Sequence, residues 1–151
     1  MTTPSITQPA PFVWHDLMTN DVAGAKAFYA KVIGWNMAAF PGGDSNYTVL
    51  SAGTVGMGGI MAMPPEACAN GAPVCWQGYI GVDDVDSCAS RISATGGAVI
   101  QPPQDIPNVG RFAVAADPQG AVFVIFKTND SNGAMPTAAP GTPGIVGWNE
   151  L

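Results

Sequence analysis

Two short segments carry polar and aromatic side chains at alternate positions, the spacing that places them on one face of a β-strand. Trp14 and Asp16 alternate in the first segment, and Gln77 and Tyr79 alternate in the second. Successive side chains of a strand point to opposite faces, so each pair shares a face. Asp16 could accept a hydrogen bond from a ligand or act as a general base, whereas the simpler alternative is a solvated carboxylate at the mouth of a pocket.

Other catalytic arrangements are not readable in the sequence. His15 is the only histidine, and its parity is opposite to that of Asp16, so we expect a structural or surface role and no Ser-His-Asp triad. The segment 56–59 is rich in glycine but lacks the strand, helix and Lys-Ser/Thr context of a phosphate-binding loop. The three cysteines form no Cys-x-x-Cys pair, which predicts reduced thiols and no disulfide framework or zinc knuckle.

The composition indicates a globular protein rather than a nucleic-acid-binding or membrane protein. The 151 residues suit one domain, and 47% hydrophobic against 11% charged residues is unlike a disordered chain. A net charge of −6 opposes binding to nucleic acid or anionic membranes. No segment approaches the about 20 apolar residues of a membrane span. Residues 1–11 lack the features of a signal peptide, so we expect a cytoplasmic location.

The pattern of apolar and turn residues predicts the order strand, helix, strand, strand, strand. We expect strands at 11–18, 35–40, 46–52 and 56–63, with a turn at 41–44. Asp21 is placed to cap the helix, and Gly34 is placed to end it in a left-handed conformation. The predicted buried face of this helix consists of Val22, Ala25, Phe28, Tyr29, Val32 and Ile33.

The same order recurs after a Pro- and Ala-bearing linker at 64–73. Strands are predicted at 75–82, 98–101, 111–115 and 121–127, and Asp84 is placed to cap the second helix. The two halves align at an offset of 63, which matches Asp21 with Asp84 and Gly34 with Gly97. This predicts an α+β fold in which two βαβββ modules, 10–63 and 74–128, form one domain within residues 1–130. Its concave, eight-stranded mixed sheet would carry the helices on the outer face.

Residues 131–151 form a Pro- and Gly-rich tail that ends by repeating the start of the domain. Trp148-Asn149-Glu150-Leu151 resembles Trp14-His15-Asp16-Leu17. One interpretation is the beginning of a second tandem domain. The other is an ordered strand that docks on the sheet or on a partner subunit.

Several of these segments, in this order and spacing, resemble the vicinal oxygen chelate superfamily of glyoxalases, bleomycin resistance proteins and extradiol dioxygenases. The segments are 14–21, 27–29, 34–35, 79–85, 96–97 and 110–120, and the resemblance covers about residues 10–128. More narrowly, the chain looks like the bacterial subgroup that often carries two such domains in tandem. One fold hosts many activities, so the resemblance implies the fold more firmly than the function.

The resemblance also implies where a metal would bind in metal-dependent members. Two ligands would lie seven residues before the helix caps, at Trp14 and Gln77, and a third on the last strand, at Val124. The repeat offset assigns the fourth position to Met61 or Ile60. Divalent cations prefer imidazole, carboxylate and amide oxygen, and only Gln77 offers such a group. We therefore predict no metal and no other cofactor, with a divalent metal as the alternative.

These observations lead to one preferred function and two alternatives. We expect a metal-free pocket for a small, partly aromatic molecule, lined by Trp14, Asp16, Tyr47, Met61, Gln77, Tyr79, Phe112, Val124 and Phe126. The first alternative is an enzyme: a metal-free one with Asp16 as base, or a metal-dependent lyase or dioxygenase that uses His15, Asp16, Gln77 and Glu150. The second is a regulatory module that pairs through its tail. A homodimer is expected in each case, because exposed sheet edges and a spare strand favour symmetric pairing.

Overall fold

Eight strands and two helices follow one another in the order that the repeat predicts, and a third, short helix lies in the linker. The computed structural model describes residues 10–42, 46–129 and 138–150. The first half contains β1 (Phe12–Thr19), α1 (Val22–Val32), β2 (Asn36–Ala39), β3 (Tyr47–Ala52) and β4 (Val55–Ala62). The short α2 (Pro65–Ala69) joins it to the second half, which contains β5 (Cys75–Gly81), α3 (Val85–Ala94), β6 (Ala98–Ile106), β7 (Gly110–Ala116) and β8 (Val122–Thr128).

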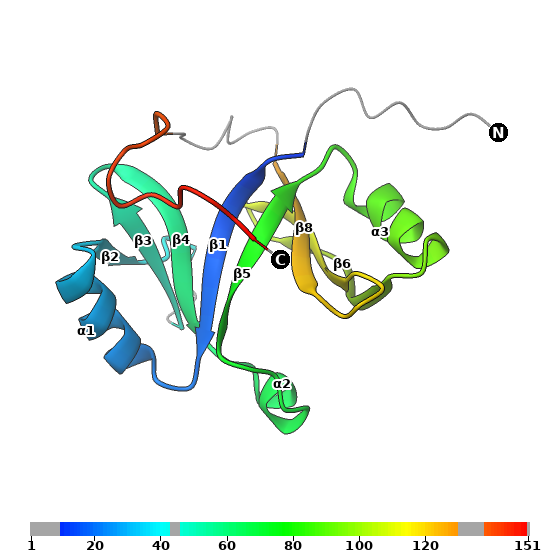
Figure 1. Ribbon diagram of the computed structural model, residues 1–151, viewed down its shortest axis with the longest axis horizontal. Helices are drawn as coiled ribbons and strands as arrows, with labels where there is room; N and C mark the ends of the chain where they lie inside the picture. The colour runs from blue at the N-terminus through cyan, green and yellow to red at the C-terminus, as the bar shows by residue number, and fades with distance from the viewer. Residues whose placement is uncertain (1–9, 43–45, 130–137, 151) are drawn as a thin grey trace.

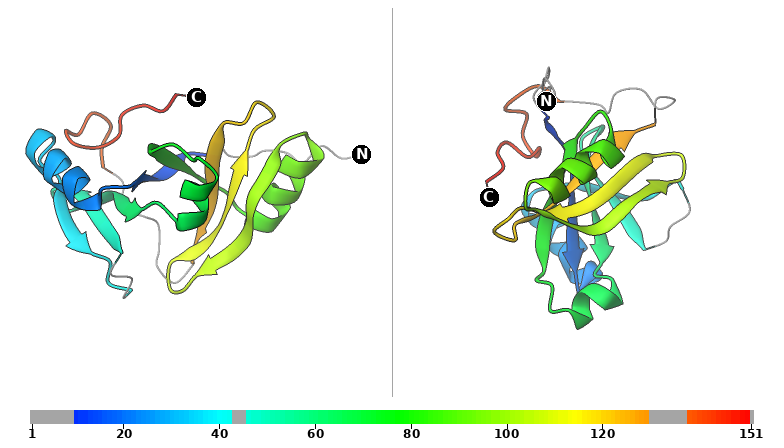
Figure 2. Two further views of the ribbon diagram at one scale, coloured as in Figure 1. Left: turned by 90° about the horizontal axis from the view of Figure 1, so that it is seen from below. Right: turned by 90° about the vertical axis from the view of Figure 1, so that its right-hand side faces the viewer.

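All eight strands form one mixed sheet, in the order β2-β3-β4-β1-β5-β8-β7-β6 (Figure 1). β1 pairs with β4 in parallel and with β5 in antiparallel orientation, so β1 and β5 join the two halves at the centre. In this central ladder His15 lies opposite Gly78, and these two residues are separated by the repeat offset of 63. A local two-fold axis therefore passes between them. Figure 2 shows the sheet curling into a U, with α1 and α3 on the outside.

The two main helices begin in the same way. The Asp21 carboxylate accepts a hydrogen bond from the backbone N–H of Gly24 at 2.8 Å, and that of Asp84 accepts one from Ser87 at 2.9 Å. Each bond satisfies a donor that the first helical turn leaves free. Gly34 has φ of 82°, which confirms the predicted left-handed stop, but the glycine with this conformation after α3 is Gly96 (φ 92°) rather than Gly97.

The core lies on the outer side of the sheet, between the strands and the helices. One cluster joins Leu17, Leu50, Met57 and Ile60 under α1, and a second joins Val85, Ala89, Ala113 and Ile125 under α3. Val22, Ala25 and Tyr29 of α1 pack on the first cluster, as predicted. The predicted burial of Phe28, Val32 and Ile33 is wrong. Their exposed fractions are 56%, 58% and 46%, because the stripe that faces the sheet is narrower than the apolar face of the helix.

Three further features differ from the sequence pattern. β6 continues through Pro102 and Pro103 to Ile106, and its pairing with β7 is irregular over this stretch, where proline is tolerated at a sheet edge. A β-bulge in β4 leaves Met57 unpaired and turns it to the helix side. Residues 138–150 contain turns and irregular backbone, so the strand expected at the end of the tail is not formed there. Leu151 and part of the turn expected at 41–44 lie outside the described residues.

Candidate functional site

Asp16 lies on β1 at the centre of the concave face, where three side chains donate hydrogen bonds to its carboxylate. Trp14 Nε1 lies 3.0 Å from Oδ1, and Tyr79 Oη lies 2.6 Å from Oδ2. Tyr47 also donates to Oδ1, and its hydroxyl oxygen lies 2.7 Å from Trp14 Nε1. The Asp16 side chain is almost fully buried, with 3% of the residue exposed. Both carboxylate oxygens are therefore occupied by donors from the protein itself.

The position of each donor follows from the register of the sheet. Trp14 lies opposite Tyr79, and Asp16 lies opposite Gln77, so the two central strands place these four side chains on one face. Tyr47 comes from β3 and must reach across β4. It can do so because Gly59 has no side chain: a Cβ atom at that position would overlap the Tyr47 hydroxyl group. Gly59 therefore opens the path between Tyr47 and Asp16.

Burial controls the protonation of these groups. It raises the pKa of Asp16 above 3.8, and the hydrogen bonds from Tyr47, Tyr79 and Trp14 only partly oppose this shift. The pKa of Tyr47 and that of Tyr79 are also raised above the ordinary value, by burial and by the neighbouring Asp16 charge. The two tyrosines therefore remain protonated hydrogen-bond donors across the physiological pH range.

The remaining predicted site residues lie on the same concave face. Met61 pairs with Tyr47 across β3 and β4. The rings of Phe126 and Tyr79 meet edge-on with their centroids 6.0 Å apart, and Phe112 lies opposite Phe126. Val124 pairs with Tyr79 and is 1% exposed, whereas Phe126 is 4% exposed. These two side chains therefore contribute mainly to the floor of the face.

The ladders show which residue of the first half corresponds to Val124, the metal position expected on the last strand. Asp16 pairs with Gly59, and Tyr79, its counterpart at an offset of 63, pairs with Val124. By these ladders the counterpart of Val124 is Gly59, rather than Met61 or Ile60, to which the sequence offset pointed. In the second half, the residue of β8 that corresponds to a residue of β4 lies two positions further along the chain than the offset of 63 predicts. The four positions carry an indole, an amide, a hydrogen atom and an isopropyl group, on Trp14, Gln77, Gly59 and Val124.

No group of three or more His, Cys, Asp or Glu side chains close enough to hold a metal ion occurs in the part of the chain that the structure describes. Within the same ranges no helix is long and apolar enough to cross a membrane.

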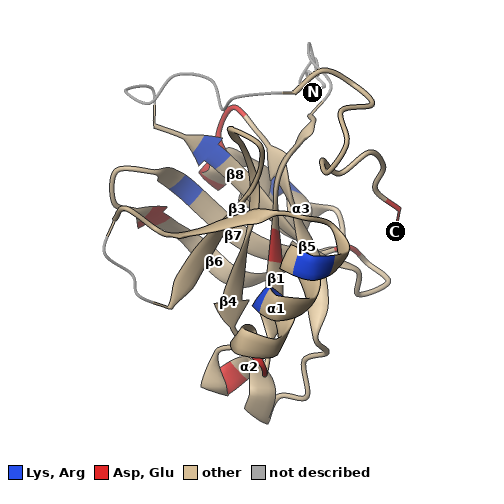
Figure 3. Ribbon diagram, turned by 90° about the vertical axis from the view of Figure 1, so that its left-hand side faces the viewer, with Lys and Arg blue, Asp and Glu red and all other residues tan. Residues whose placement is uncertain are grey.

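The five Lys and Arg residues are scattered over several elements (Figure 3). One of them, Arg111, is paired with Asp86 at 2.7 Å and with Asp105 at 3.1 Å. The surface thus offers no concentrated basic patch on these residues.

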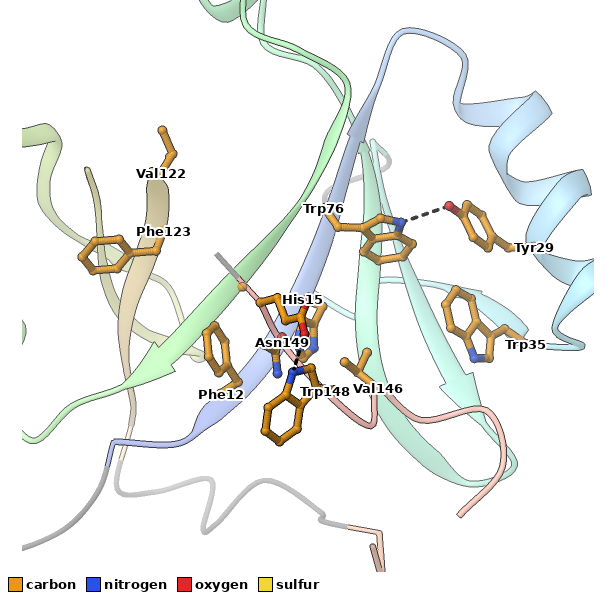
Figure 4. Close-up of a pocket in the computed structure, with 12 residues that line it drawn as sticks. Phe12, His15, Tyr29, Trp35, Trp76, Val122, Phe123, Val146, Trp148 and Asn149 are labelled. Atoms are coloured by element: carbon orange, nitrogen blue, oxygen red, sulfur yellow. Dashed lines mark hydrogen bonds between the residues drawn. The ribbon is translucent and has the colours of Figure 1, made fainter. Parts of the chain in front are cut away.

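His15 lies on the opposite face of the sheet from Asp16, as its parity predicts. Its Nε2 atom lies 2.7 Å from Asn149 Oδ1, and its ring stacks on Phe12. Beside it is a cavity of about 390 Å³, which is closed on one side by the tail (Figure 4). None of the nine predicted ligand-binding residues lines this cavity. The sequence analysis did not predict that aromatic residues such as Trp35, Trp76 and Trp148 would line a site. Trp76 precedes Gln77 on its strand, so strand parity places it on the opposite face of the sheet.

Comparison with known proteins agrees with the fold. The sequence profile of the Glyoxalase/Bleomycin resistance protein/Dioxygenase superfamily matches residues 12–125. The chain is 41% identical over 123 residues to the putative glyoxylase CFP32 of Mycobacterium tuberculosis, covering 81% of this chain and 46% of that protein. It is 33% identical over 154 residues to the anthracycline biosynthesis protein DnrV of Streptomyces peucetius, covering 95% of this chain and 55% of that protein.

The chain thus spans about half the length of these curated relatives. Among solved structures, methylmalonyl-CoA epimerase from M. tuberculosis superposes with a TM-score of 0.59 at 15% identity, covering 82% of this chain and 91% of the epimerase. At this identity the likeness concerns the fold alone. The profile match, the identity to CFP32 and DnrV and the eight-stranded sheet agree: the chain belongs to the glyoxalase/bleomycin resistance protein/dioxygenase superfamily.

Proposed function

We propose that the concave face binds a small, partly aromatic molecule without the help of a metal ion. The observation that carries the proposal is the buried Asp16 carboxylate, which accepts hydrogen bonds from Trp14, Tyr47 and Tyr79. These three side chains remain partly exposed on the concave face. Rings fixed in this way lose little conformational freedom when a ligand stacks on them. Mostly apolar surfaces with a few fixed polar groups are typical of small-molecule sites.

The donor set at the metal positions does not fit a divalent cation. Of the four side chains only Gln77 offers an oxygen ligand, and Tyr47 fills the space above Gly59 where a further ligand would be needed. Mg²⁺, Mn²⁺, Ni²⁺ and Zn²⁺ sites need several oxygen, nitrogen or sulfur ligands. Gln77 lies opposite Asp16 in the ladder, and the carboxylate of Asp16 already accepts hydrogen bonds from Tyr47 and Tyr79. The Gln77 amide can therefore bind the polar edge of an organic ligand.

The same network favours binding over proton transfer by Asp16. A general base must come within hydrogen-bond reach of the proton that it removes. Here the carboxylate is buried beneath three donors, so a substrate would first have to displace Tyr47 or Tyr79. The base role of Asp16 therefore stays a weaker prediction than its role as an anchor of the aromatic face.

Two relatives support an aromatic ligand by their names. DnrV and DauV, which are 33% and 32% identical to this chain, are both named for anthracycline biosynthesis. Anthracyclines contain planar fused rings, and a planar ligand suits a face lined by Trp14, Tyr47 and Tyr79. We extend to this chain the ligand class of planar aromatic compounds with carbonyl or hydroxyl groups. The predicted homodimer, for which β2 and β6 are the exposed sheet edges, remains a separate proposal.

A thermal-shift screen in EDTA tests the proposal. The library contains planar aromatic compounds, among them hydroxyanthraquinones, and matched aliphatic compounds. Binding to the native state must raise stability, by about 2.7 kcal/mol when the ligand is at 100 times its Kd. We expect stabilisation by aromatic compounds that is weakened in Gln77→Ala and unchanged in Gln119→Ala, an exposed control. No stabilising compound, or stabilisation that requires added Mn²⁺, Ni²⁺ or Zn²⁺, would contradict it.

A further inference from the structure

We propose that the cavity on the helix side of the sheet is a second binding site, which takes a small organic cation such as an amine or a quaternary ammonium compound. The cavity of about 390 Å³ lies between β1, β5 and β8, next to α1, and Val146, Trp148, Asn149 and Glu150 of the tail line one side of it (Figure 4). It opens on the face opposite to Asp16, so this site is independent of the concave one.

A cluster of three aromatic rings forms one wall. The ring centroids of Tyr29 and Trp35 are 5.3 Å apart, those of Tyr29 and Trp76 are 5.4 Å apart, and those of Trp35 and Trp76 are 5.8 Å apart. The indole N–H groups of this wall are already used. Trp35 Nε1 donates to the carbonyl oxygen of Gly144 at 2.5 Å, and Trp76 Nε1 donates to Tyr29 Oη at 3.0 Å. The wall therefore offers a ligand aromatic carbon surface and no free indole N–H group.

The faces of aromatic rings carry negative potential and attract cations, and tryptophan is the strongest of the aromatic residues in this respect. The charge of the cavity points the same way. Glu150 is the one residue among Asp, Glu, Lys and Arg in its lining, as far as the described chain shows. The chain as a whole carries a net charge of −6. An aromatic wall with one carboxylate and no Lys or Arg side chain favours cations over anions.

The tail supplies an exposed indole and a carboxylate to the cavity. Trp148 is 78% exposed, and its Nε1 lies 3.2 Å from Glu150 Oε1, so the indole and the carboxylate of the tail stand side by side. His15 and Trp35 hold the neighbouring residues Asn149 and Gly144 on the sheet. A cation between Trp148 and the wall would contact both, and would bury an indole that is now exposed.

The four tryptophans supply a direct test, because they divide between the two faces. Trp35, Trp76 and Trp148 line the cavity, whereas Trp14 bonds to Asp16 on the concave face. We would titrate ¹⁵N-labelled protein with benzyltrimethylammonium chloride and follow the four indole N–H signals. Benzyl alcohol serves as the neutral comparison and benzoate as the anionic one. We expect saturable shifts of the three cavity signals with the cation, no shift of the Trp14 signal, and no saturable shift with benzoate.

Two substitutions assign the contacts. Trp148→Ala should raise the Kd of the cation about two- to fivefold, the range for a cation–π contact at an exposed site. Its high exposure means that folding should be unaffected. Glu150→Gln should raise the Kd of the cation and leave the Kd of benzyl alcohol unchanged. Glu66→Gln, at an exposed position on α2, should change neither Kd. Added salt should raise the Kd of the cation for the wild type.

The outcomes separate this site from the concave one. Shifts confined to Trp14 would place the cation on the concave face and overturn the proposal. So would a lack of any saturable shift, equal affinity for benzoate and the cation, or an unchanged Kd in both Trp148→Ala and Glu150→Gln. A failure of the aromatic library on the concave face would leave the shifts of the cavity signals intact, so the two proposals fail independently.

Discussion

Replacing Asp16 by asparagine should change how stability depends on pH, and the direction follows from the burial of the carboxylate. Burial raises the pKa of folded Asp16 above 3.8, the value expected in the unfolded chain. Between these two pKa values the folded protein retains a proton that the unfolded chain has lost. The folded state then binds more protons, so the free energy of unfolding decreases as the pH rises through this window. Below about pH 3.8 the penalty for the buried charge is absent.

The magnitude is bounded by linkage. One titrating group changes the free energy of unfolding by at most about 1.4 kcal/mol per pH unit within the window. An amide cannot ionise in this range, so Asp16→Asn removes this dependence while the amide oxygen keeps an acceptor for Trp14 and Tyr47. At neutral pH, Asp16→Ala should cost about 1–3 kcal/mol, because the hydroxyl groups of Tyr47 and Tyr79 lose the carboxylate that accepts their hydrogen bonds.

Urea unfolding of the wild type and Asp16→Asn from pH 3.5 to 8 measures this effect, because the other carboxylates cancel in the difference between the two proteins. We expect the wild type to gain stability relative to Asp16→Asn as the pH falls. A difference that is constant over the whole range would refute the assigned environment of Asp16. A wild type that loses relative stability at low pH would show that the hydrogen bonds outweigh the burial, with a lowered pKa.

Three further predictions concern the parts that hold the site in place. Gly59→Ala should displace Tyr47 and cost about 1–3 kcal/mol by urea unfolding, whereas Gly56→Ala, whose Cβ would lie 3.4 Å from Trp14, should cost less; equal effects would refute the role of Gly59. Asp84→Ala and Asp21→Ala should each cost about 1 kcal/mol through the lost helix cap, and no change in thermal stability would argue against capping. Leu50→Ala should cost about 2–5 kcal/mol, and Phe28→Ala, at 56% exposure, about 0.5 kcal/mol or less; a reversed order would contradict the assigned core.

The order of the elements was predictable because it depends on local signals. Asp21 and Asp84 each mark the start of a helix with a hydrogen bond that lies within one turn. Strand parity was equally local, and it placed Trp14 and Asp16 on one face and His15 on the other. Repetition of these signals at one offset was sufficient to identify the two halves of the sheet.

The contacts across the sheet were less accessible to sequence reasoning. The role of Gly59 depends on the register of β1, β3 and β4 together, and a displacement of two residues in β8 misdirected the assignment to Met61 or Ile60. The exposure of Phe28 depends on the angle at which α1 packs on the sheet, which its apolar pattern does not specify. The cavity could not be predicted because the tail forms part of its lining. The resemblance of the segment at Trp148 to the segment at Trp14 predicted a strand there, whereas the structure has irregular backbone.

The most direct test of the metal-free concave site is a calorimetric titration of the best planar aromatic compound, in EDTA and again with added Mn²⁺, Ni²⁺ or Zn²⁺. The indole N–H signal of Trp14 is followed by NMR in the same samples. We predict one Kd in all conditions and a saturable shift of the Trp14 signal. Binding that disappears in EDTA, or shifts that spare Trp14 and affect only Trp35, Trp76 and Trp148, would contradict the central claim.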